Sequence, residues 1–582
     1  MSKARNNLPK YLNKYITTQD YSVYTAIDQA VWRYVMFISV PFYKKHAHSI
    51  YLEGLEKTGI PLDHIPHIET MDKKLDEFGW GAVAVKGFIP PTAFMDMLAN
   101  KVLAIGVDIR TAKHLMYTPA PDIIHETAGH APIIADKDYA NYLCSYGEIS
   151  KKAISSKSDE DTYEIIRKLS DLKEDPNASN EEISRYESLL LESNQTNGYI
   201  SEAAELARMN WWTAEYGMIG SINNPKIYGA GLLSSVIEGF ESINPKVEKI
   251  NYDLDCIKYN YDITEQQPQL FVTNNFNTLT KLLNDYAKTM AYQTGGMDGI
   301  KKAKKSKTVT TSLLDSNLSI SGILSNYHTN KDSLSYLQFS GPSQLCYNKK
   351  EIEGHNKEYH KDGFGCPIGT IKDINKGLHE CNEADLSLLN IKLGSKIDIK
   401  YNNGIQVSGI ILDIKFIDDK PLIIKLDQCT VMSKENILFN PEWGYYDLIS
   451  GTDIQSVYGG PADYKKYYNE EDDSLNYQQS STLSEENKDL NKVYEKIQSI
   501  KSNSIKQSNI NDILNELSIK YPNDWLVLFE LYNIIKNDVK CINIKAELVN
   551  RLESIEKIDK EHAIIIRRGI DIVNTSLATP VT

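Results

Sequence analysis

The sequence lacks the features that direct a chain to a membrane or to nucleic acid. It contains no run of about 18 apolar residues, so we expect no transmembrane helix. Its first residues, MSKARNNLP, include no apolar stretch that would serve as a signal peptide. Lys and Arg number 64 against 78 Asp and Glu, and the net charge of −14 argues against general nucleic-acid binding. These absences predict a cytoplasmic protein with no membrane and no nucleic acid among its partners.

Closely spaced cysteines are missing as well. The seven cysteines are scattered at positions 144, 256, 346, 366, 381, 429 and 541, and none forms a Cys-x-x-Cys pair. An odd number with such spacing does not indicate a disulfide framework, and we expect most of them to be buried thiols. His355, His360 and Cys366 are mildly suggestive of a structural metal. Without a close cluster of partners, the default interpretation is that they are loop or core residues.

The sequence does contain an unusual pair of histidines. Residues 125–130 read HETAGH, with His125 and His130 at the two ends. A zinc-peptidase helix carries His-Glu-x-x-His, in which ligands four residues apart share one face. Here the interval is five residues, which on a regular helix separates the two imidazoles by about 140°. A plain zinc-peptidase site is therefore disfavoured, and a third metal ligand must come from elsewhere in the chain.

Glu215 is a candidate for that third ligand. Residues 201–217 are rich in Ala, Leu, Met and Glu and end in Gly217, which predicts a helix. Trp211 lies one helical turn before Glu215 and on the same face, so a large flat ring would lie beside the carboxylate. A lone Glu on a helix is more often a solvated surface residue. Two His and one carboxylate are, however, the facial triad of non-haem Fe(II) oxygenases.

Four segments in order carry a family resemblance: residues 85–94, 117–130, 211–217 and 227–235. Together they resemble the aromatic amino acid hydroxylases, and most of all the bacterial-type phenylalanine 4-hydroxylases, over residues 10–300. The resemblance implies a mainly α catalytic domain that uses Fe(II) and a tetrahydropterin, either tetrahydrobiopterin or a bacterial analogue, as cosubstrate. It also implies that L-phenylalanine, O2 and the reduced pterin become L-tyrosine and a 4a-hydroxypterin.

The resemblance implies a role for each matching residue around the metal and the cofactor. His125, His130 and Glu215 match the iron ligands of the family. The expected pterin-binding residues are Phe94, on which the pterin ring stacks, Glu126, whose carboxylate faces the pterin, and Gly87 and Ile89, in the bordering loop. Without the resemblance, Phe94 would be read as an ordinary core aromatic.

The resemblance also implies how the amino-acid substrate is bound. Arg110 matches the arginine that binds the substrate carboxylate, and Asp122 would hold the planar guanidinium in place. Without the resemblance these two residues would be read as an ordinary ion pair. The remaining expected contacts are Thr118 and Ser234, which would bond the polar end of the zwitterion, and Pro121, Trp211 and Tyr216, which would form the walls around the ring.

The predicted preference among aromatic substrates rests on Trp211 and Val272. Trp211 is typical of members that act on phenylalanine or tyrosine, whereas tryptophan hydroxylases tend to have a smaller aromatic. Val272 stands where tyrosine hydroxylases carry an acid, so a ring without a hydroxyl is favoured. Tyr216 departs from the family, in which Phe is usual at that position. Phenylalanine is the predicted substrate. The alternatives are a tryptophan or tyrosine hydroxylase with the same site and, from another class, a zinc hydrolase.

The length of the chain and its changes in composition predict several parts. We expect the catalytic domain in residues 1–305, with a charged helical insertion at 151–198. Residues 306–334, rich in Ser, Thr and Asn, are a predicted linker. Alternating apolar residues and an Asn-Asn-Gly turn predict a small β-rich domain in residues 335–465. An acidic linker at 466–488 and a helical region at 489–582 follow.

The second half of the chain resembles no family, and its role is open. A regulatory or protein-binding module is the default interpretation, because no acid-base constellation stands out in residues 335–582. A protein partner or self-association through the C-terminal half is therefore an expectation, alongside L-phenylalanine, O2 and reduced pterin at the catalytic site.

Overall fold

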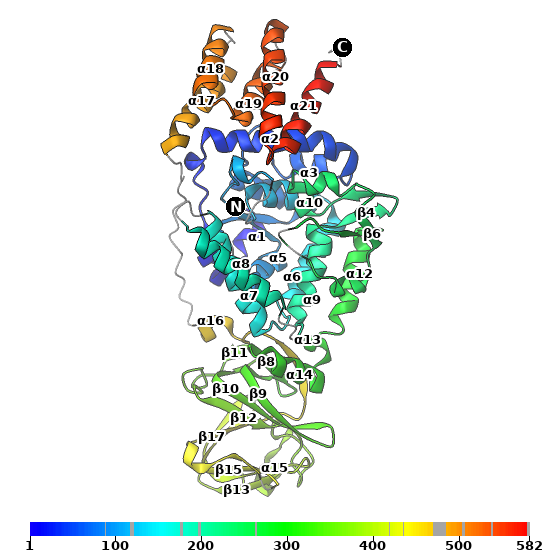
Figure 1. Cartoon of the computed structure of the whole chain (residues 1–582). Coiled ribbons are helices and arrows are strands. Elements are labelled where there is room, and N and C mark those ends of the chain that lie inside the picture. The colour runs from blue at the N-terminus through cyan, green and yellow to red at the C-terminus, as the bar shows by residue number, and fades with distance from the viewer. Residues whose placement is uncertain are drawn as a thin grey trace.

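The computed structural model describes residues 1–87, 89–116, 121–174, 178–195, 199–261, 263, 265–417, 419–434, 436–468, 485–502, 507–536 and 539–578. A mainly helical body occupies the middle of the molecule, with helices α17–α21 at one end and the β-rich part at the other (Figure 1). Within the described ranges, no helix is both long and apolar enough to cross a membrane.

The helical body is formed by residues before about position 306. Its helices are α1 (Lys3–Asn6), α2 (Ala26–His46), α3 (Tyr51–Lys57), α4 (Ile68–Leu75), α5 (Pro91–Ala99), α6 (Lys137–Ser150), α7 (Lys157–Glu174), α8 (Asn180–Gln195), α9 (Glu202–Asn210), α10 (Ala230–Ser234), α11 (Glu238–Glu241), α12 (Phe276–Ala287), α13 (Ala291–Thr294) and α14 (Gly296–Ser306). One small sheet has the order β1 (Ile16–Thr17), β2 (Gly81–Val85), β3 (Val102–Gly106). A second has the order β5 (Asn224–Ile227), β4 (Met218–Ser221), β7 (Gln269–Thr273), β6 (Glu248–Asn251).

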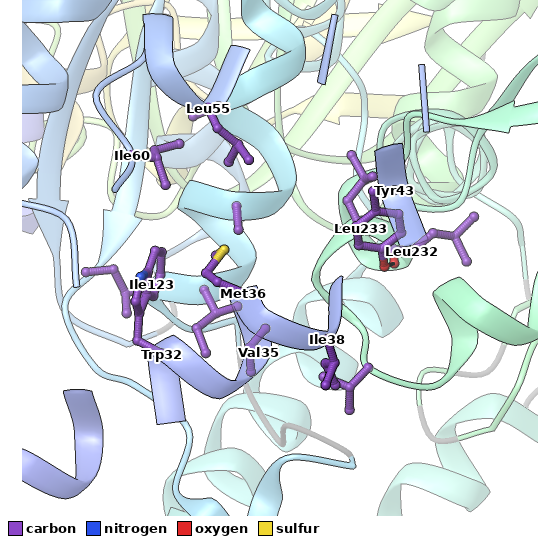
Figure 2. Packing of buried hydrophobic residues seen from close by; sticks show 14 of the residues in the cluster. Trp32, Val35, Met36, Ile38, Tyr43, Leu55, Ile60, Ile123, Leu232 and Leu233 are labelled. Carbon is purple, nitrogen blue, oxygen red and sulfur yellow. Dashed lines mark hydrogen bonds between the residues drawn. The ribbon is translucent and has the colours of Figure 1, made fainter. Parts of the chain in front are cut away.

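Helix α2 is the central element of this body. Thr25 and Asp28 form a reciprocal capping box that begins the helix. Trp32, Val35 and Met36 recur at helical spacing and are buried. Figure 2 shows Trp32 beside Ile123, and Tyr43 beside Leu232 and Leu233. The segment that begins the metal-site turn thus packs directly on α2.

The insertion at 151–198 contains two helices, as the sequence predicts. Helix α7 precedes α8, and the two pack against each other. The backbone N–H of Glu182 donates to Ser179 Oγ over 3.2 Å, and this bond caps the start of α8.

The prediction of a linker at 306–334 is wrong. Strands β8 (Val309–Leu314) and β9 (Leu318–Asn330) occupy this segment and pair with each other. The composition rich in Ser, Thr and Asn predicts a linker, but Thr310, Thr311 and Ser312 are buried. Thr311 Oγ1 and Ser321 Oγ lie 2.9 Å apart across the two strands. A cross-strand bond between two hydroxyls, as in this pair, allows polar side chains inside a sheet.

The β-rich part contains two larger sheets. The first has the order β11 (Lys350–Glu351), β10 (Ser333–Tyr347), β9, β8, β18 (Ile454–Gly459), and β12 (Gly363–Pro367) also pairs with β10. The second has the order β13 (Lys396–Lys400), β14 (Ile405–Ile417), β15 (Lys420–Ser433), β16 (Asn436–Phe439), and β17 (Tyr446–Ile449) also pairs with β15. The predicted Asn-Asn-Gly turn joins β13 to β14, with Gly404 at φ +88°.

Helices α17–α21 share one hydrophobic core with the catalytic body. They are α17 (Glu485–Ser502), α18 (Gln507–Lys520), α19 (Trp525–Ile535), α20 (Ile542–Ile558) and α21 (Ala563–Ala578), and most of the predicted acidic linker before them lies outside the described residues. Helices α17, α19 and α21 of this group pack against α2 (Figure 1). Tyr34 Oη donates to the carbonyl of Ile565 over 2.6 Å, and Arg33 pairs with Glu530 over 2.7 Å. Both contacts are made by α2.

Candidate active site

The two histidines lie on a π-helical turn. Residues His125–His130 have the wider winding in which the N–H of one residue bonds the carbonyl five positions earlier. This winding corrects the expectation from a regular helix, because residues five apart then face the same side. The rings of His125 and His130 lie 4.9 Å apart, edge to face. On a π-helical turn, the five-residue interval between His125 and His130 therefore places both imidazoles on one face.

A tight contact holds this turn in place. Gly129 packs against α10, and a Cβ at this position would lie 2.8 Å from the carbonyl oxygen of Ala230. Thr127 Oγ1 donates to the carbonyl of Ile123 over 2.5 Å. Only a residue without a side chain allows α10 to approach the turn so closely.

Glu215 meets both histidines. It ends a second π-helical turn, Trp211–Glu215, which continues from α9. Glu215 Oε2 lies 3.3 Å from His125 Nε2, and Glu215 Oε1 lies 3.3 Å from His130 Nε2. Burial would raise the pKa of Glu215, but His130 and His125 outweigh that effect and hold it far below its usual value. The three predicted ligands therefore form one partly buried group of nitrogen and oxygen donors.

The orientation of His125 is fixed from behind. Its Nδ1 lies 3.0 Å from Ser234 Oγ, at the end of α10, and its backbone N–H donates to Asp122 Oδ1 over 3.0 Å. If Nε2 is to face a metal, Nδ1 must carry the ring proton and donate it to Ser234. Ser234 was predicted only as a substrate contact, and the structure places it against a metal-ligand candidate.

Arg110 and Asp122 form a buried two-pronged pair. Arg110 Nε donates to Asp122 Oδ2 over 2.8 Å, and Nη2 donates to Oδ1 over 2.7 Å. Arg110 Nη1 donates to the carbonyl of Ser234 over 3.1 Å. Burial would raise the pKa of Asp122, but the Arg110 guanidinium outweighs that effect and lowers it. The pair is therefore charged and tied to the same Ser234 that orients His125.

A stack of aromatic rings stands beside the metal-ligand group. Trp211 lies between Tyr216, at 4.7 Å, and Tyr261, at 4.3 Å between ring centroids. Trp211 Nε1 donates to Gln267 Oε1 over 3.2 Å, and Tyr216 Oη donates to Glu238 Oε2 over 2.8 Å. These bonds fix both rings. Val272, also predicted here, is buried in β7 opposite Met218.

The predicted pterin side is less enclosed. Gly87 is exposed with φ +51°, and Phe94, on α5, is partly buried between two apolar clusters. Glu126 is buried, and its Oε2 has no hydrogen-bond partner among the residues that the structure describes. Burial raises the pKa of Glu126 to about 8. An unpaired buried carboxyl of this kind fits a polar ligand edge that completes it.

Three predicted site residues remain: Thr118, Pro121 and Ile89. Thr118 lies outside the described residues, and Pro121 is exposed. Ile89 is partly buried against the cluster that also contacts Phe94.

The family model for biopterin-dependent aromatic amino acid hydroxylases matches residues 3–170 and 195–335, just over half of the 582 residues. The chain belongs to this family. The unmatched residues 171–194 fall within the insertion that carries α7 and α8. The match reaches into β8, β9 and the start of β10, beyond the predicted catalytic boundary at 305.

Several relatives of this hydroxylase are similar over about half of its length. The phenylalanine-4-hydroxylase of Mesorhizobium japonicum is 28% identical over 295 residues, which cover 50% of this chain and 87% of the relative. That of Chromobacterium violaceum is 27% identical over 272 residues, covering 46% and 76%. A crystal structure of the latter with iron(III) and 7,8-dihydrobiopterin has 25% identity and a TM-score of 0.38, covering 47% of this chain and 86% of that one.

Sequence reasoning missed the residues that support the aromatic wall of this hydroxylase. Tyr261, Gln267 and Glu238 contact Trp211 or Tyr216, yet none lies within the motifs that carry the resemblance. Their spacing gives no signal, because a loop and a short helix bring them in from different parts of the chain. Only the folded geometry reveals them.

Proposed function

We propose that this hydroxylase is a phenylalanine 4-monooxygenase that converts L-phenylalanine to L-tyrosine with O2 and a tetrahydropterin. The observation that carries the proposal is the convergence of His125, His130 and Glu215, with both His–Glu distances at 3.3 Å. Two imidazoles and one carboxylate suit Fe(II) and leave coordination positions open. The relatives named phenylalanine-4-hydroxylase support the substrate.

The donor set fits iron, and the protein's task is to hold it in one geometry. Iron and reduced pterin together supply the activation of O2. Ser234 keeps His125 in the tautomer that exposes Nε2, and the π-helical turn presents His130 beside it. Burial of the group limits the access of water to the reacting atoms.

Arg110 has donors left for the substrate carboxylate. A guanidinium has five N–H donors, and Arg110 uses one on Nε, one on Nη2 and one on Nη1 for Asp122 and Ser234. One N–H on each terminal nitrogen remains, which is the pair needed for a two-pronged bond. Ser234 Oγ accepts from His125 and keeps its own proton to donate to the same zwitterion.

The aromatic wall selects the ring. Trp211 and Tyr216 are fixed by Gln267 and Glu238, so the wall is rigid. The apolar Val272 offers no partner to a ring hydroxyl, which favours phenylalanine over tyrosine as substrate. Phe94 provides a face for the pterin, and Glu126 a carboxyl for its polar edge.

The test is oxygen-dependent turnover by the full chain loaded with Fe(II). Wild type is expected to form tyrosine from phenylalanine in proportion to tetrahydropterin oxidised, and Glu215→Ala to form none. Glu248→Ala, at an exposed carboxylate outside the site, is the matched control and should keep full activity. Full activity of iron-stripped protein, or of Glu215→Ala, contradicts the proposal.

Substrate choice needs a separate experiment. Competition among phenylalanine, tyrosine and tryptophan at equal concentrations should give tyrosine from phenylalanine as the main product. Preferred conversion of tryptophan or tyrosine would reassign the substrate and leave the metal site unaffected. Zinc in place of iron, together with no oxygen consumption, would instead indicate a hydrolase.

A further inference from the structure

A second group of metal-binding side chains lies in the β-rich part, away from the catalytic site. His355 and His360 lie in the segment between β11 and β12, and Asp447 lies on β17. One ligand atom from each of these three residues lies within 4.8 Å of the other two. His355 Nδ1 and His360 Nε2 are 3.2 Å apart. All three residues are buried, with 9%, 7% and 5% of their surface exposed.

We propose that His355, His360 and Asp447 form a second metal site, for Zn²⁺ or a similar borderline divalent cation, that joins the two sheets of the β-rich part. Ligands about 2.0–2.1 Å from a tetrahedral Zn²⁺ lie about 3.3 Å from one another. The 3.2 Å between His355 Nδ1 and His360 Nε2 is close to this ligand–ligand distance. It also matches the 3.3 Å contacts of the catalytic group.

The carboxylate of Asp447 gives independent support. Its Oδ1 is buried and has no hydrogen-bond partner among the described residues, although the Tyr359 hydroxyl bonds to the same carboxyl group. A buried carboxylate oxygen without a partner is costly unless a ligand or ion completes it. Cys366, which the sequence placed beside the two histidines, is not in the group. Asp447, about 80 positions further along the chain, takes its place.

The surrounding charges are mixed. Lys425 stands opposite Asp447 in the β15–β17 register, and its ammonium lies over the rings of Tyr445, at 4.6 Å, and Tyr359, at 5.4 Å. Lys415 Nζ donates to the carbonyl of Glu353 over 2.7 Å. Asp413 adds a negative charge near His355. Both lysines are therefore engaged by other partners, a pair of rings and a carbonyl oxygen.

The position of the group explains what a cation would do there. His355 and His360 precede β12, which pairs with β10 in the first sheet, whereas Asp447 lies in the second sheet. Apolar side chains of the two sheets meet in one cluster, in which Leu337 of β10 lies with Ile423 of β15 and Ile449 of β17. A cation held by the two histidines and Asp447 would connect the segment before β12, in the first sheet, to β17 in the second. Only three protein ligands are present, so a fourth position would be left to solvent beside the half-exposed Tyr359.

The experiment is a metal analysis of the full chain. Apo-protein is loaded with Fe(II) and Zn²⁺, freed of excess metal, and its content measured by mass spectrometry. Wild type should hold about one iron and one zinc per chain. His125→Ala with Glu215→Ala should lose the iron and keep the zinc. Asp447→Asn, which preserves side-chain size, and His360→Ala should lose the zinc and keep the iron and tyrosine formation.

Two further measurements make the result decisive. Cobalt(II) added to the variant without the catalytic ligands reports the second group alone through its visible absorption, and Asp447→Asn should abolish that signal. His328→Ala, on β9 of the same β-rich part but outside the group, is the matched control and should bind normally. A wild type with no second equivalent, or Asp447→Asn and His360→Ala variants that retain it, overturns the proposal.

Discussion

At the scale of single residues, Ser234 links His125, a proposed metal ligand, to Arg110, the residue proposed to bind the substrate carboxylate. Its hydroxyl lies against His125 Nδ1, and its carbonyl accepts from Arg110 Nη1. The family motifs predicted the identities of His125, His130, Glu215 and Arg110 from sequence alone. They did not predict this link, because it depends on how α10 packs on the metal-site turn rather than on any spacing.

Ser234→Ala should weaken iron binding. The substitution removes the acceptor of the His125 ring proton but keeps the carbonyl that binds Arg110. Loss of such a supporting bond typically lowers metal affinity by about 10- to 100-fold. Competition with a calibrated chelator measures the affinity. Unchanged iron affinity would mean that Ser234 does not orient His125.

Asp122→Asn should destabilise the fold in a pH-dependent way. Removing one charge from a buried pair typically costs about 3–5 kcal/mol. The pKa of Asp122 is lowered by Arg110, so the stabilisation is fully present above the unfolded pKa of about 3.9 and is lost as the pH falls through the lowered value. Urea unfolding should therefore show a gap between wild type and variant at pH 7 that narrows below about pH 4. A gap that does not change with pH contradicts the charged-pair assignment.

At the scale of elements, the two π-helical turns decide the site. Regular helix geometry places His125 and His130 far apart, and a five-residue interval alone gives no reason to expect the wider winding. The Asn-Asn-Gly hairpin and the helical character of residues 489–582, by contrast, follow from local signals in the sequence. The polar composition of residues 306–334 led to the wrong prediction of a linker. Ser and Thr that are buried in strands give a segment the same composition as a linker, and the sequence does not show which strands will cover them.

Gly129→Ala should disturb the metal-site turn. The added Cβ would lie 2.8 Å from the Ala230 carbonyl oxygen and 3.0 Å from its Cβ, so α10 or the turn must move. Overpacking of this kind costs about 1–3 kcal/mol. We expect a lower unfolding midpoint and a larger loss of iron than of helix content, measured by calorimetry and metal analysis. Normal iron content and stability would show that the turn tolerates the shift.

At the scale of the whole molecule, the C-terminal helices are part of the catalytic core rather than a separate appendage. Tyr34, on α2, is 1% exposed and contacts Trp525 and Phe529 of α19. Arg568, on α21, lies 4.0 Å over the ring of Phe240 and 3.2 Å from Glu241. Propensity predicted these helices but not their partner, because the contacts join residues more than 300 positions apart in sequence.

Removal of residues 485–582 should therefore destabilise the catalytic body. The truncation uncovers the apolar face of α2 around Tyr34 and leaves Arg33 without Glu530. We expect a lower thermal midpoint or aggregation of the truncated chain, measured by light scattering during heating. A truncated protein with the stability and activity of the full chain would show that the helices are dispensable.

The central claim is that one iron ion is held by His125, His130 and Glu215. Anomalous diffraction at the iron absorption edge from crystals of the Fe(II)-loaded full chain tests it most directly. The account predicts a single strong iron peak in contact with the two Nε2 atoms and the Glu215 carboxylate. An iron peak elsewhere, or none at these three residues in fully loaded and active protein, would contradict it.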